Sequence, residues 1–313
     1  MGVGSYLKPT LLLDFFIGGQ MEPKGINNDI QYWLAIVNEY IKQRNTRELY
    51  QPGSRIAPSL IVLFYNLFPV PCFDLGLESF RNKYIKNETE IEQVSNNDEY
   101  TAIEQKGMRA MYDHIEQYKF ESGGEELTLF ELKTLHRLLY SFTSYPEYAG
   151  MFRNAQARFS MGIVDTCLPH QISYEFYDLD KEFNHIIKLP HNTGNDLINY
   201  IDECVKLTTK LLKIHPFNDG NGRSIRGLLN LMFKKANIPP VYVVPKEKAI
   251  YNDALIKAQI DNEYHQSDYT DIIMFYYYKI CDSLIEIDSQ LKNNYEIDDD
   301  GVRIYKMIPS KLI

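Results

Sequence analysis

Apolar residues recur three and four positions apart over most of the chain. This spacing predicts helices over residues 32–41, 127–139, 197–214 and 225–233. Residues 60–73 are the most apolar stretch, but Asn66, Pro69 and Pro71 interrupt it. The stretch is also shorter than the roughly 20 residues that a membrane-spanning helix needs. We therefore expect a mainly α protein in which residues 60–73 belong to the core.

One segment departs from the helical pattern. Over residues 150–169, short alternating pieces flank Gly162 and end at Pro169, which predicts a β-hairpin or an extended flap. A lone hairpin in a helical protein usually has a function at the surface. We place the flap at about residues 155–168.

The polar and acidic residues 86–99 are the best candidate for a boundary within the chain. We therefore expect a helical N-terminal extension over residues 1–92 and a central domain over residues 93–290. Residues 291–313 carry little periodicity and are expected to be a tail.

Charge and cysteine usage exclude several classes of protein. The chain has 33 Lys and Arg against 42 Asp and Glu, a net charge of -9, so nothing draws it as a whole to nucleic acid or to anionic membranes. The cysteines are too scattered for a zinc site or a disulfide framework, and no cleaved leader is evident: Cys72, Cys167, Cys204 and Cys281. We expect a cytoplasmic protein. The 24 tyrosines are expected in the core and at interfaces rather than in a base-stacking platform.

The segment with the clearest chemistry is residues 214–226, which lies between two predicted helices and includes the run HPFNDGNGRSIR. Its glycines allow tight turns in which successive N–H groups converge on an anion at the positive end of the following helix. Arg223 and Arg226 lie three apart, on one side of the first helical turn, where guanidinium groups bind phosphate oxygens. We infer a phosphate-binding loop.

Two further residues of this segment suit a transfer reaction. Asp219 offers a carboxylate of the kind that Mg²⁺ takes beside phosphates. His215 has an ordinary pKa of about 6.5, so it can take a proton from a hydroxyl near neutral pH. Each residue alone is weak evidence, but nine fixed positions together arise by chance with a probability on the order of 10⁻⁹.

This segment resembles the signature of the Fic family, H-P-F-x-[DE]-G-N-G-R-x-x-R, at every constrained position. Weaker resemblances lie upstream, in Leu135-His136-Arg137-Leu138 and Gly150-Met151-Phe152-Arg153, and downstream at Tyr251-Asn252-Asp253-Ala254-Leu255. Residues 95–285 are covered, with decreasing specificity away from the loop. The resemblance implies a helical core with a β-hairpin flap, so the central domain is a Fic domain, and transfer of AMP from ATP to a hydroxyl of a target protein.

The resemblance also implies a role for each matching residue. His215 would be the general base, and Asp219 would hold Mg²⁺ between the α- and β-phosphates of ATP. The phosphates would be positioned by Gly220, Asn221, Gly222 and Arg223, and Arg226 would bind the γ-phosphate. Tyr251 is a candidate for the adenine pocket. The flap would bind the target protein by pairing with its backbone.

Many Fic proteins carry an inhibitory helix, [ST]-x-x-x-E-[GN], whose glutamate pairs with the second arginine of the signature. Tyr100-Thr101-Ala102-Ile103-Glu104-Gln105 resembles it, although Tyr100 and Gln105 depart from the flanking positions. We expect Glu104 to pair with Arg226 and to compete with ATP. Residues 95–99 are a second candidate for this segment.

Several alternatives stay open at this stage. The same loop serves other nucleotide donors and the removal of AMP from a target, for which Glu104 would orient water. A protein of another class would use the loop only to sense nucleotide. The target protein and the oligomeric state, including a homodimer, are also open.

Overall fold

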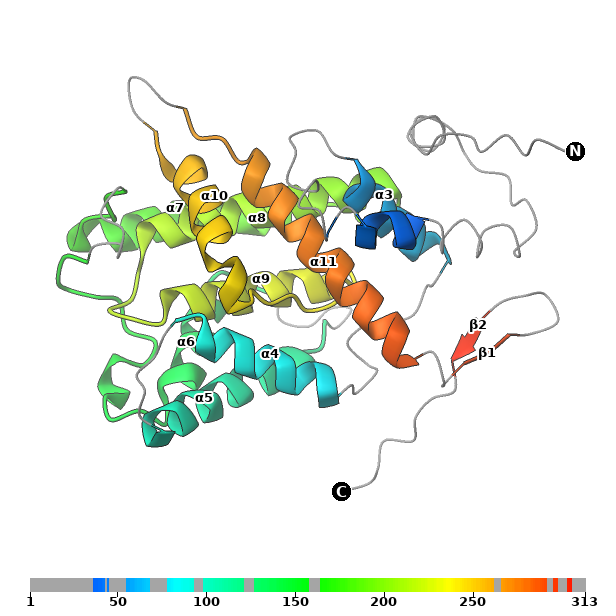
Figure 1. Cartoon of the computed structure of the whole chain (residues 1–313). Helices are drawn as coiled ribbons and strands as arrows, with labels where there is room; N and C mark the ends of the chain where they lie inside the picture. The colour runs from blue at the N-terminus through cyan, green and yellow to red at the C-terminus, as the bar shows by residue number, and fades with distance from the viewer. Residues whose placement is uncertain are drawn as a thin grey trace, which may run out of the picture.

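A computed structural model describes residues 36–42, 44, 55–67, 78–92, 98–120, 127–157, 164–261, 266–291, 295–297 and 303–305. The described chain is dominated by helices, as the apolar periodicity predicts (Figure 1). The α-helices are α3 (Ile56–Leu67), α4 (Glu78–Glu90), α5 (Asp98–Gln117), α6 (Glu131–Tyr140), α7 (Ile172–Ile186), α8 (Gly194–Ile214), α9 (Asn221–Lys235), α10 (Lys248–Gln259) and α11 (Thr270–Leu291).

Short 3₁₀ turns and two short strands complete the described elements. The turns are η2 (Pro146–Tyr148), η3 (Pro169–Gln171) and η4 (Pro245–Glu247), and the strands β1 (Tyr295–Ile297) and β2 (Arg303–Tyr305) pair antiparallel with Tyr295 opposite Tyr305. These strands lie in the region expected to be a tail.

Helices α8 and α9 lie at the centre of the molecule. Helix α9 is buried along nearly its whole length and packs against α5, α6 and α8. Helix α8 packs in addition against α3, α7, α10 and α11 (Figure 1). Because α9 is enclosed by these helices from its first turn, it holds the loop before it against the core.

Helix α8 begins at a side-chain cap that the sequence provides. The backbone N–H of Asp196 donates to Oγ1 of Thr193 at 3.2 Å, and this hydroxyl donates to the Asp196 carboxylate at 2.7 Å. Asp196 in the first turn also suits the positive end of the helix. The helix then runs for 21 residues to Ile214, where the phosphate-binding loop begins.

Helices α3 and α4 precede residue 93 but share one hydrophobic core with the later helices. Ile61 of α3 and Tyr84 of α4 are fully buried in the same cluster as Leu228 of α9. Helix α3 packs against α8 and α11, and α4 packs against α5. The polar residues 86–99, expected to separate two parts of the chain, are helical through Glu90 and include the fully buried Glu88.

The predicted flap is only partly described. Its two described arms, residues 155–157 and 164–168, contain one isolated β-bridge residue, Asp165, and no strand, and residues 158–163 lie outside the described residues. The arms are joined by the Thr166 hydroxyl, which donates to the Ala157 carbonyl at 2.6 Å. The hairpin therefore stays a prediction.

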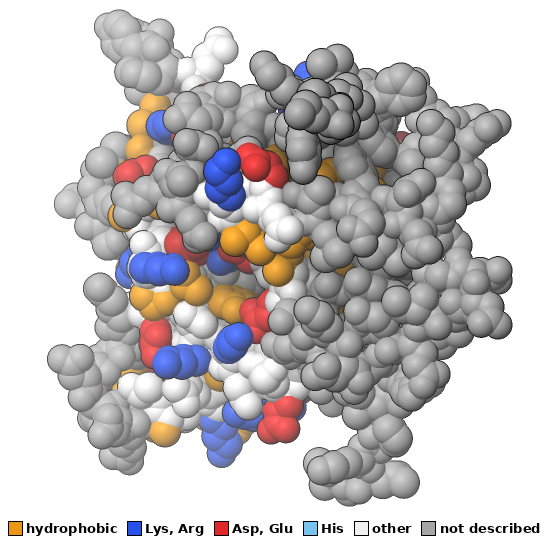
Figure 2. Space-filling model, turned by 45° about the vertical axis from the view of Figure 1, so that its right-hand side comes forward, with side chains coloured by type: hydrophobic (Ala, Val, Ile, Leu, Met, Phe, Trp, Pro, Cys, Tyr) orange, Lys and Arg blue, Asp and Glu red, His pale blue; other side chains and the backbone are white. Residues whose placement is uncertain are grey.

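The surface of the described chain mixes both signs of charge. In the part of the face in Figure 2 that is coloured by residue type, Lys and Arg side chains lie among Asp, Glu and apolar side chains. Among the described helices, none combines the length and the apolar character that crossing a bilayer requires. Cys167, Cys204 and Cys281 are free thiols.

Candidate active site

The candidate site is built on the turn that joins α8 to α9. His215 ends α8 in a left-handed conformation, with φ 54° and ψ 61°, and its N–H donates to the Leu211 carbonyl at 3.0 Å. Residues other than glycine rarely adopt this conformation, which costs about 1–2 kcal/mol. The surrounding structure therefore has to hold the backbone at His215 in place.

Arg153 supplies part of that support. Its Nε donates to the His215 carbonyl at 2.6 Å, and its backbone N–H donates to the Pro216 carbonyl at 2.9 Å. The carbonyls at the end of a helix carry partial negative charge and lack partners within the helix. A guanidinium at this position therefore satisfies them and balances the charge.

The second half of the loop is braced by Asn221. Its amide accepts a hydrogen bond from the Phe217 N–H and donates to the Phe217 carbonyl, both at 2.8 Å. Gly220 begins α9 in a left-handed conformation with φ 71°, which glycine adopts without strain. Because both groups of the Asn221 side chain are used within the loop, its contribution to a phosphate site would come from its backbone N–H.

Helix α6 supports the loop through two aromatic side chains, His136 and Tyr140. The ring of His136 stacks between Tyr140, at 4.6 Å between centroids, and Phe217, at 3.8 Å. Its Nε2 donates to the Asp219 carbonyl at 3.0 Å, and the Tyr140 hydroxyl donates to Oδ2 of Asp219 at 2.6 Å. The position of Asp219 is thus set by α6 as well as by the loop.

His136 is held in one neutral form. The Gly150 N–H donates to its Nδ1 at 2.8 Å, so that the proton of the neutral ring sits on Nε2. Burial lowers the pKa of His136 from 6.5 to about 4, against the opposing effects of the Asp219 carbonyl and carboxylate. His136 therefore stays uncharged at neutral pH and links the loop to Gly150, where the predicted flap segment begins.

Arg226, the second arginine of the loop, is bound by two carboxylates of the α4 region. Its Nε donates to Glu88 and its Nη2 donates to Glu92, both at 2.7 Å. Glu88 is fully buried and also accepts the Val243 N–H at 3.2 Å, whereas the Glu92 side chain is 32% exposed. Burial raises the pKa of Glu88. Burial also acts to raise the pKa of Glu92, but the charge and hydrogen bond of Arg226, together with the charges of Arg223 and Lys248, lower it overall.

The Glu92 carboxylate lies over the first turn of α9. A methyl group placed on Gly222 would lie 2.6 Å from Oε1 of Glu92 and 2.9 Å from Nη1 of Arg226. Only a glycine leaves room for an anion at this position. We call the backbone of residues 220–222 together with Arg226 the anion cradle; the carboxylate of Glu92 occupies it.

Glu104, which the sequence suggests as the partner of Arg226, pairs with Arg223 instead. Arg223 is 1% exposed and pairs with Glu104 of α5, which is equally buried, and its Nη2 lies 3.9 Å from Oδ2 of Asp219. The expected pairing of Glu104 with Arg226 is therefore wrong. The reason is geometric, because α5 packs beside the face of α9 that carries Arg223, whereas the α4 region faces Arg226.

Tyr251 lies beside this site but not on its surface. It is 3% exposed, its ring packs 5.3 Å from that of Phe275, and the Arg226 guanidinium lies 5.8 Å from its ring centre. This burial argues against direct contact between Tyr251 and an adenine ring. Its contribution to a nucleotide site would be made through Arg226.

His215 has the protonation state that a general base requires. Burial, followed by the positive charge of Arg153, lowers the pKa of its imidazole to about 4. The ring is therefore neutral at pH 7 and able to accept a proton.

The donor set around Asp219 suits a magnesium ion that is completed by phosphates and water. The Asp219 side chain is 71% exposed. Within the described residues, no group of three or more His, Cys, Asp or Glu side chains could hold a metal ion. Because Mg²⁺ usually takes only one or two protein carboxylates, a single accessible carboxylate beside an anion cradle fits this ion.

Four residues that shape the site are not among the sequence candidates: Glu88, Glu92, Tyr140 and Arg153. A signal for the glutamates was present, because Glu88 and Glu92 stand four apart, the spacing of neighbours on one helical face. Tyr140 and Arg153 lie in or beside segments that match the family only weakly, and no local pattern assigns them a contact.

Comparisons with known proteins relate the segment that contains the loop to one family. A model of the Fic/DOC family matches residues 126–233, a range that includes the whole loop. The protein adenylyltransferase Fic of Nematostella vectensis is 28% identical over 134 residues, which are 43% of this chain and 29% of that protein. The Drosophila virilis protein of the same name is 31% identical over 123 residues, 39% of this chain and 23% of that protein. The matched part thus spans about a quarter of these relatives.

Solved structures show the same fold. Fic-1 of C. elegans (residues 134–508) superposes with a TM-score of 0.56 at 17% identity, over 84% of this chain and 74% of that one. A Fic-domain signalling protein of Bacteroides thetaiotaomicron gives a TM-score of 0.56 at 15% identity, over 81% and 97% of the two chains. The loop motif and the match over residues 126–233 both point to the Fic/DOC family, and the helical fold is that of solved Fic structures.

Proposed function

We propose that this protein is a protein adenylyltransferase that transfers AMP from ATP to a hydroxyl side chain of a target protein. The oxygen of the target hydroxyl would attack the α-phosphorus, the bond from that phosphorus to the oxygen bridging to the β-phosphate would break, and pyrophosphate would leave. The observation that carries this proposal is an anion cradle at the start of α9 with a neutral histidine on the turn before it. The names of the relatives support the same activity.

The residues of the loop divide the work of this reaction. His215 would accept the proton of the target hydroxyl, for which its neutral ring is suited. The backbone N–H groups of residues 220–222 and the Arg226 guanidinium would bind the phosphates, and Asp219 would hold Mg²⁺, which neutralises phosphate charge. Transfers of this kind depend on positioning and charge neutralisation, which this arrangement supplies. Because Arg223 is buried, it would contribute its positive charge to the phosphate site from the interior side of the loop.

We further propose that the protein is autoinhibited through Glu92 rather than through Glu104. The Glu92 carboxylate lies in the anion cradle and pairs with Arg226, so it would compete with the phosphates of ATP. Glu88 would keep Arg226 in place when Glu92 leaves, because Glu88 is fully buried and has a second partner in the Val243 N–H.

The remaining expectations about partners stay part of this proposal. The flap segment would bind the target by pairing with its backbone. A homodimer and a cytoplasmic location stay predictions from the sequence.

The position of Glu92 also favours a second candidate, removal of AMP from a modified target. In that reaction a carboxylate beside the cradle would orient the attacking water. A third candidate, a module that only senses nucleotide, would bind ATP and form no covalent product.

The test is label transfer from α-labelled ATP with Mg²⁺, with intact-mass detection of self-modification. The comparison includes the wild-type chain, His215→Ala, Glu92→Gly and the variant with both changes. Glu90→Gly is the matched control, because Glu90 lies on α4 and pairs only with Lys86 among the described residues, at 3.8 Å. We expect Glu92→Gly to gain an adenylyl group that the wild-type chain lacks. The variant that combines Glu92→Gly with His215→Ala should not gain this group.

Other outcomes separate the candidates. If Glu92→Gly gains no adduct but loses the ability to release AMP from a modified protein, AMP removal replaces transfer. If all variants bind ATP equally and none forms a product, the nucleotide-sensing function stands instead. A gain of adduct in Glu90→Gly as well would contradict the specific role of Glu92.

A further inference from the structure

Arg153 makes more contacts than support of the loop alone requires. Its side chain is 2% exposed and lies between the end of α8 and the two described arms of the flap segment. Its hydrogen-bond partners among the described residues are four backbone carbonyls and one hydroxyl. A buried guanidinium with partners of this kind holds several backbone segments in a fixed relation.

One edge of the guanidinium holds the end of α8. Nε donates to the His215 carbonyl at 2.6 Å, and Nη2 donates to the Ile214 carbonyl at 3.2 Å. The two carbonyls belong to the last helical residue and to the left-handed residue after it. These bonds therefore act on the backbone position that a non-glycine residue adopts only under constraint.

The end of the guanidinium, formed by Nη1 and the shared Nη2, holds the flap segment. Nη1 donates to the Ala155 carbonyl of the first arm at 2.8 Å. Nη2 donates to Oγ1 of Thr166 at 3.4 Å and to the Cys167 carbonyl, both in the second arm. One side chain thus contacts both arms and the residue that would act as base.

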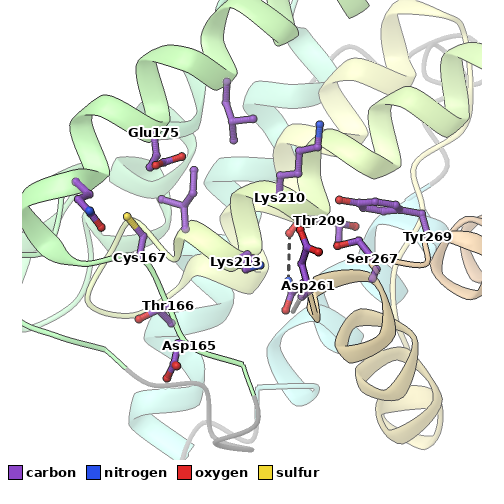
Figure 3. Close-up of a pocket in the computed structure, with 15 residues that line it drawn as sticks. Asp165, Thr166, Cys167, Glu175, Thr209, Lys210, Lys213, Asp261, Ser267 and Tyr269 are labelled. Atoms are coloured by element: carbon purple, nitrogen blue, oxygen red, sulfur yellow. Dashed lines mark hydrogen bonds between the residues drawn. The ribbon is translucent and has the colours of Figure 1, made fainter. Parts of the chain in front are cut away.

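The outer side of the second arm is not continuously packed. Asp165, Thr166 and Cys167 border a cavity of about 400 Å³. Its other walls come from η3, α7, α8, the end of α10 and residues between α10 and α11. Figure 3 shows these three residues on one side of the cavity and Lys213 of α8 across from them. Apolar packing does not fill this space. The second arm is therefore held in place largely by polar contacts on the side away from the cavity, including those with Arg153.

We propose that Arg153 is a positioning residue that couples the flap segment to His215, so that one guanidinium sets both the backbone of the base and the arms beside it. This inference rests on the proposed transfer for its catalytic consequence, because the flap would hold the target whose hydroxyl His215 deprotonates. A lysine in its place keeps the charge but has a single donor centre and loses the fork that reaches all three segments.

The first test measures the coupling without any reaction. Amide hydrogen exchange is followed by mass spectrometry in the full chain for wild type, Arg153→Lys and Arg109→Lys, the last an exposed arginine of α5 as matched control. We expect exchange in Arg153→Lys to become at least about tenfold faster both at the amides of Ile214 and His215 and in the flap arms. The control should match wild type.

A second variant guards against a general loss of folding. Thr166→Val keeps Arg153 but removes the hydroxyl to which it donates in the second arm. We expect faster exchange in the arms and also, by about threefold, at the amides of Ile214 and His215, with the melting temperature unchanged. Exchange that rises in the arms alone, or in neither segment, contradicts the coupling.

The second test measures the catalytic consequence in the Glu92→Gly background. We expect Arg153→Lys to lower the rate of self-modification at saturating ATP by about 10- to 100-fold while the KM for ATP changes less than twofold. An equal rate, or a loss that appears only in KM, overturns the positioning role. If Glu92→Gly itself transfers no AMP, the proposed function fails, and the exchange experiment still decides the coupling.

Discussion

The Glu92 carboxylate lies 2.7 Å from Nη2 of Arg226, although the two residues are 134 positions apart in the sequence. With Glu88 on Nε of the same guanidinium, Arg226 has one carboxylate partner in the interior and one at the surface. The interior partner suits permanent support, whereas the surface partner can be replaced by another anion.

Loss of Glu88 should destabilise the protein, whereas loss of Glu92 should not. Glu88→Ala leaves the buried Arg226 charge and the Val243 N–H without this partner, and we expect the free energy of unfolding to fall by about 3–5 kcal/mol. Because Glu92 is partly exposed, Glu92→Ala should change the free energy of unfolding by about 1 kcal/mol or less. Urea unfolding of both variants checks this, and equal losses would contradict the division.

Glu104 should behave as a structural residue. Both Glu104 and Arg223 are 1% exposed, so Glu104→Ala leaves a buried guanidinium without its carboxylate partner. We expect a loss of about 3–5 kcal/mol in the free energy of unfolding and no gain in self-modification. Thermal unfolding and label transfer on the same samples are the measurements. A stable Glu104→Ala variant with raised transfer would restore the inhibitory role suggested by the sequence.

Tyr140 should set the metal dependence of nucleotide binding. Tyr140→Phe removes only the hydroxyl that donates to Oδ2 of Asp219, which leaves this carboxylate free to rotate. Since partners behind a ligating residue typically change metal affinity 10- to 100-fold, we expect the Mg²⁺ concentration for half-maximal ATP binding to rise by about tenfold. Calorimetric titration at several Mg²⁺ concentrations measures this. The exposed Tyr145 provides the control variant Tyr145→Phe, and the same Mg²⁺ dependence in both would refute the role.

His136 should make the protein less stable as the pH falls. Its pKa is about 4 in the folded protein and about 6.5 in the unfolded chain, so between these values the unfolded state binds more protons. The free energy of unfolding should therefore decrease from pH 6.5 towards pH 4, by about 3 kcal/mol from this residue. In His136→Asn this part of the pH dependence should disappear, whereas in His170→Asn, which changes an exposed histidine, it should remain. Urea unfolding at pH 7 and pH 4.5 compares them.

Local patterns were sufficient for much of the fold and for the loop. The apolar spacing predicted the helices that became α6, α8 and α9, because their buried faces follow the helical period. The loop from His215 to Arg226 was found because its residues are contiguous and their chemistry is local. The left-handed backbone at His215 was not predictable in this way, since histidine has no preference for it.

The partners of the arginines could not be read from local patterns. Residues 86–92 are charged, and a charged helix is normally solvated, yet Glu88 is buried because Arg226 lies opposite it. Glu104 carried the better sequence match to the inhibitory helix, but only the packing of α5 against α9 directs it to Arg223. Which carboxylate pairs with which arginine therefore depends on contacts between residues more than 100 positions apart.

The shared core of α3, α4 and the later helices has a practical consequence for anyone who shortens this chain. A version that begins at residue 93 would lack both Glu88 and Glu92 and would expose the apolar residues that pack on α4, Tyr112 of α5 among them. Enzymatic measurements on such a fragment would describe a site with no internal competitor and a weakened scaffold. The proposed transfer and the proposed inhibition by Glu92 therefore have to be tested on a chain that keeps α4 and the turn after it.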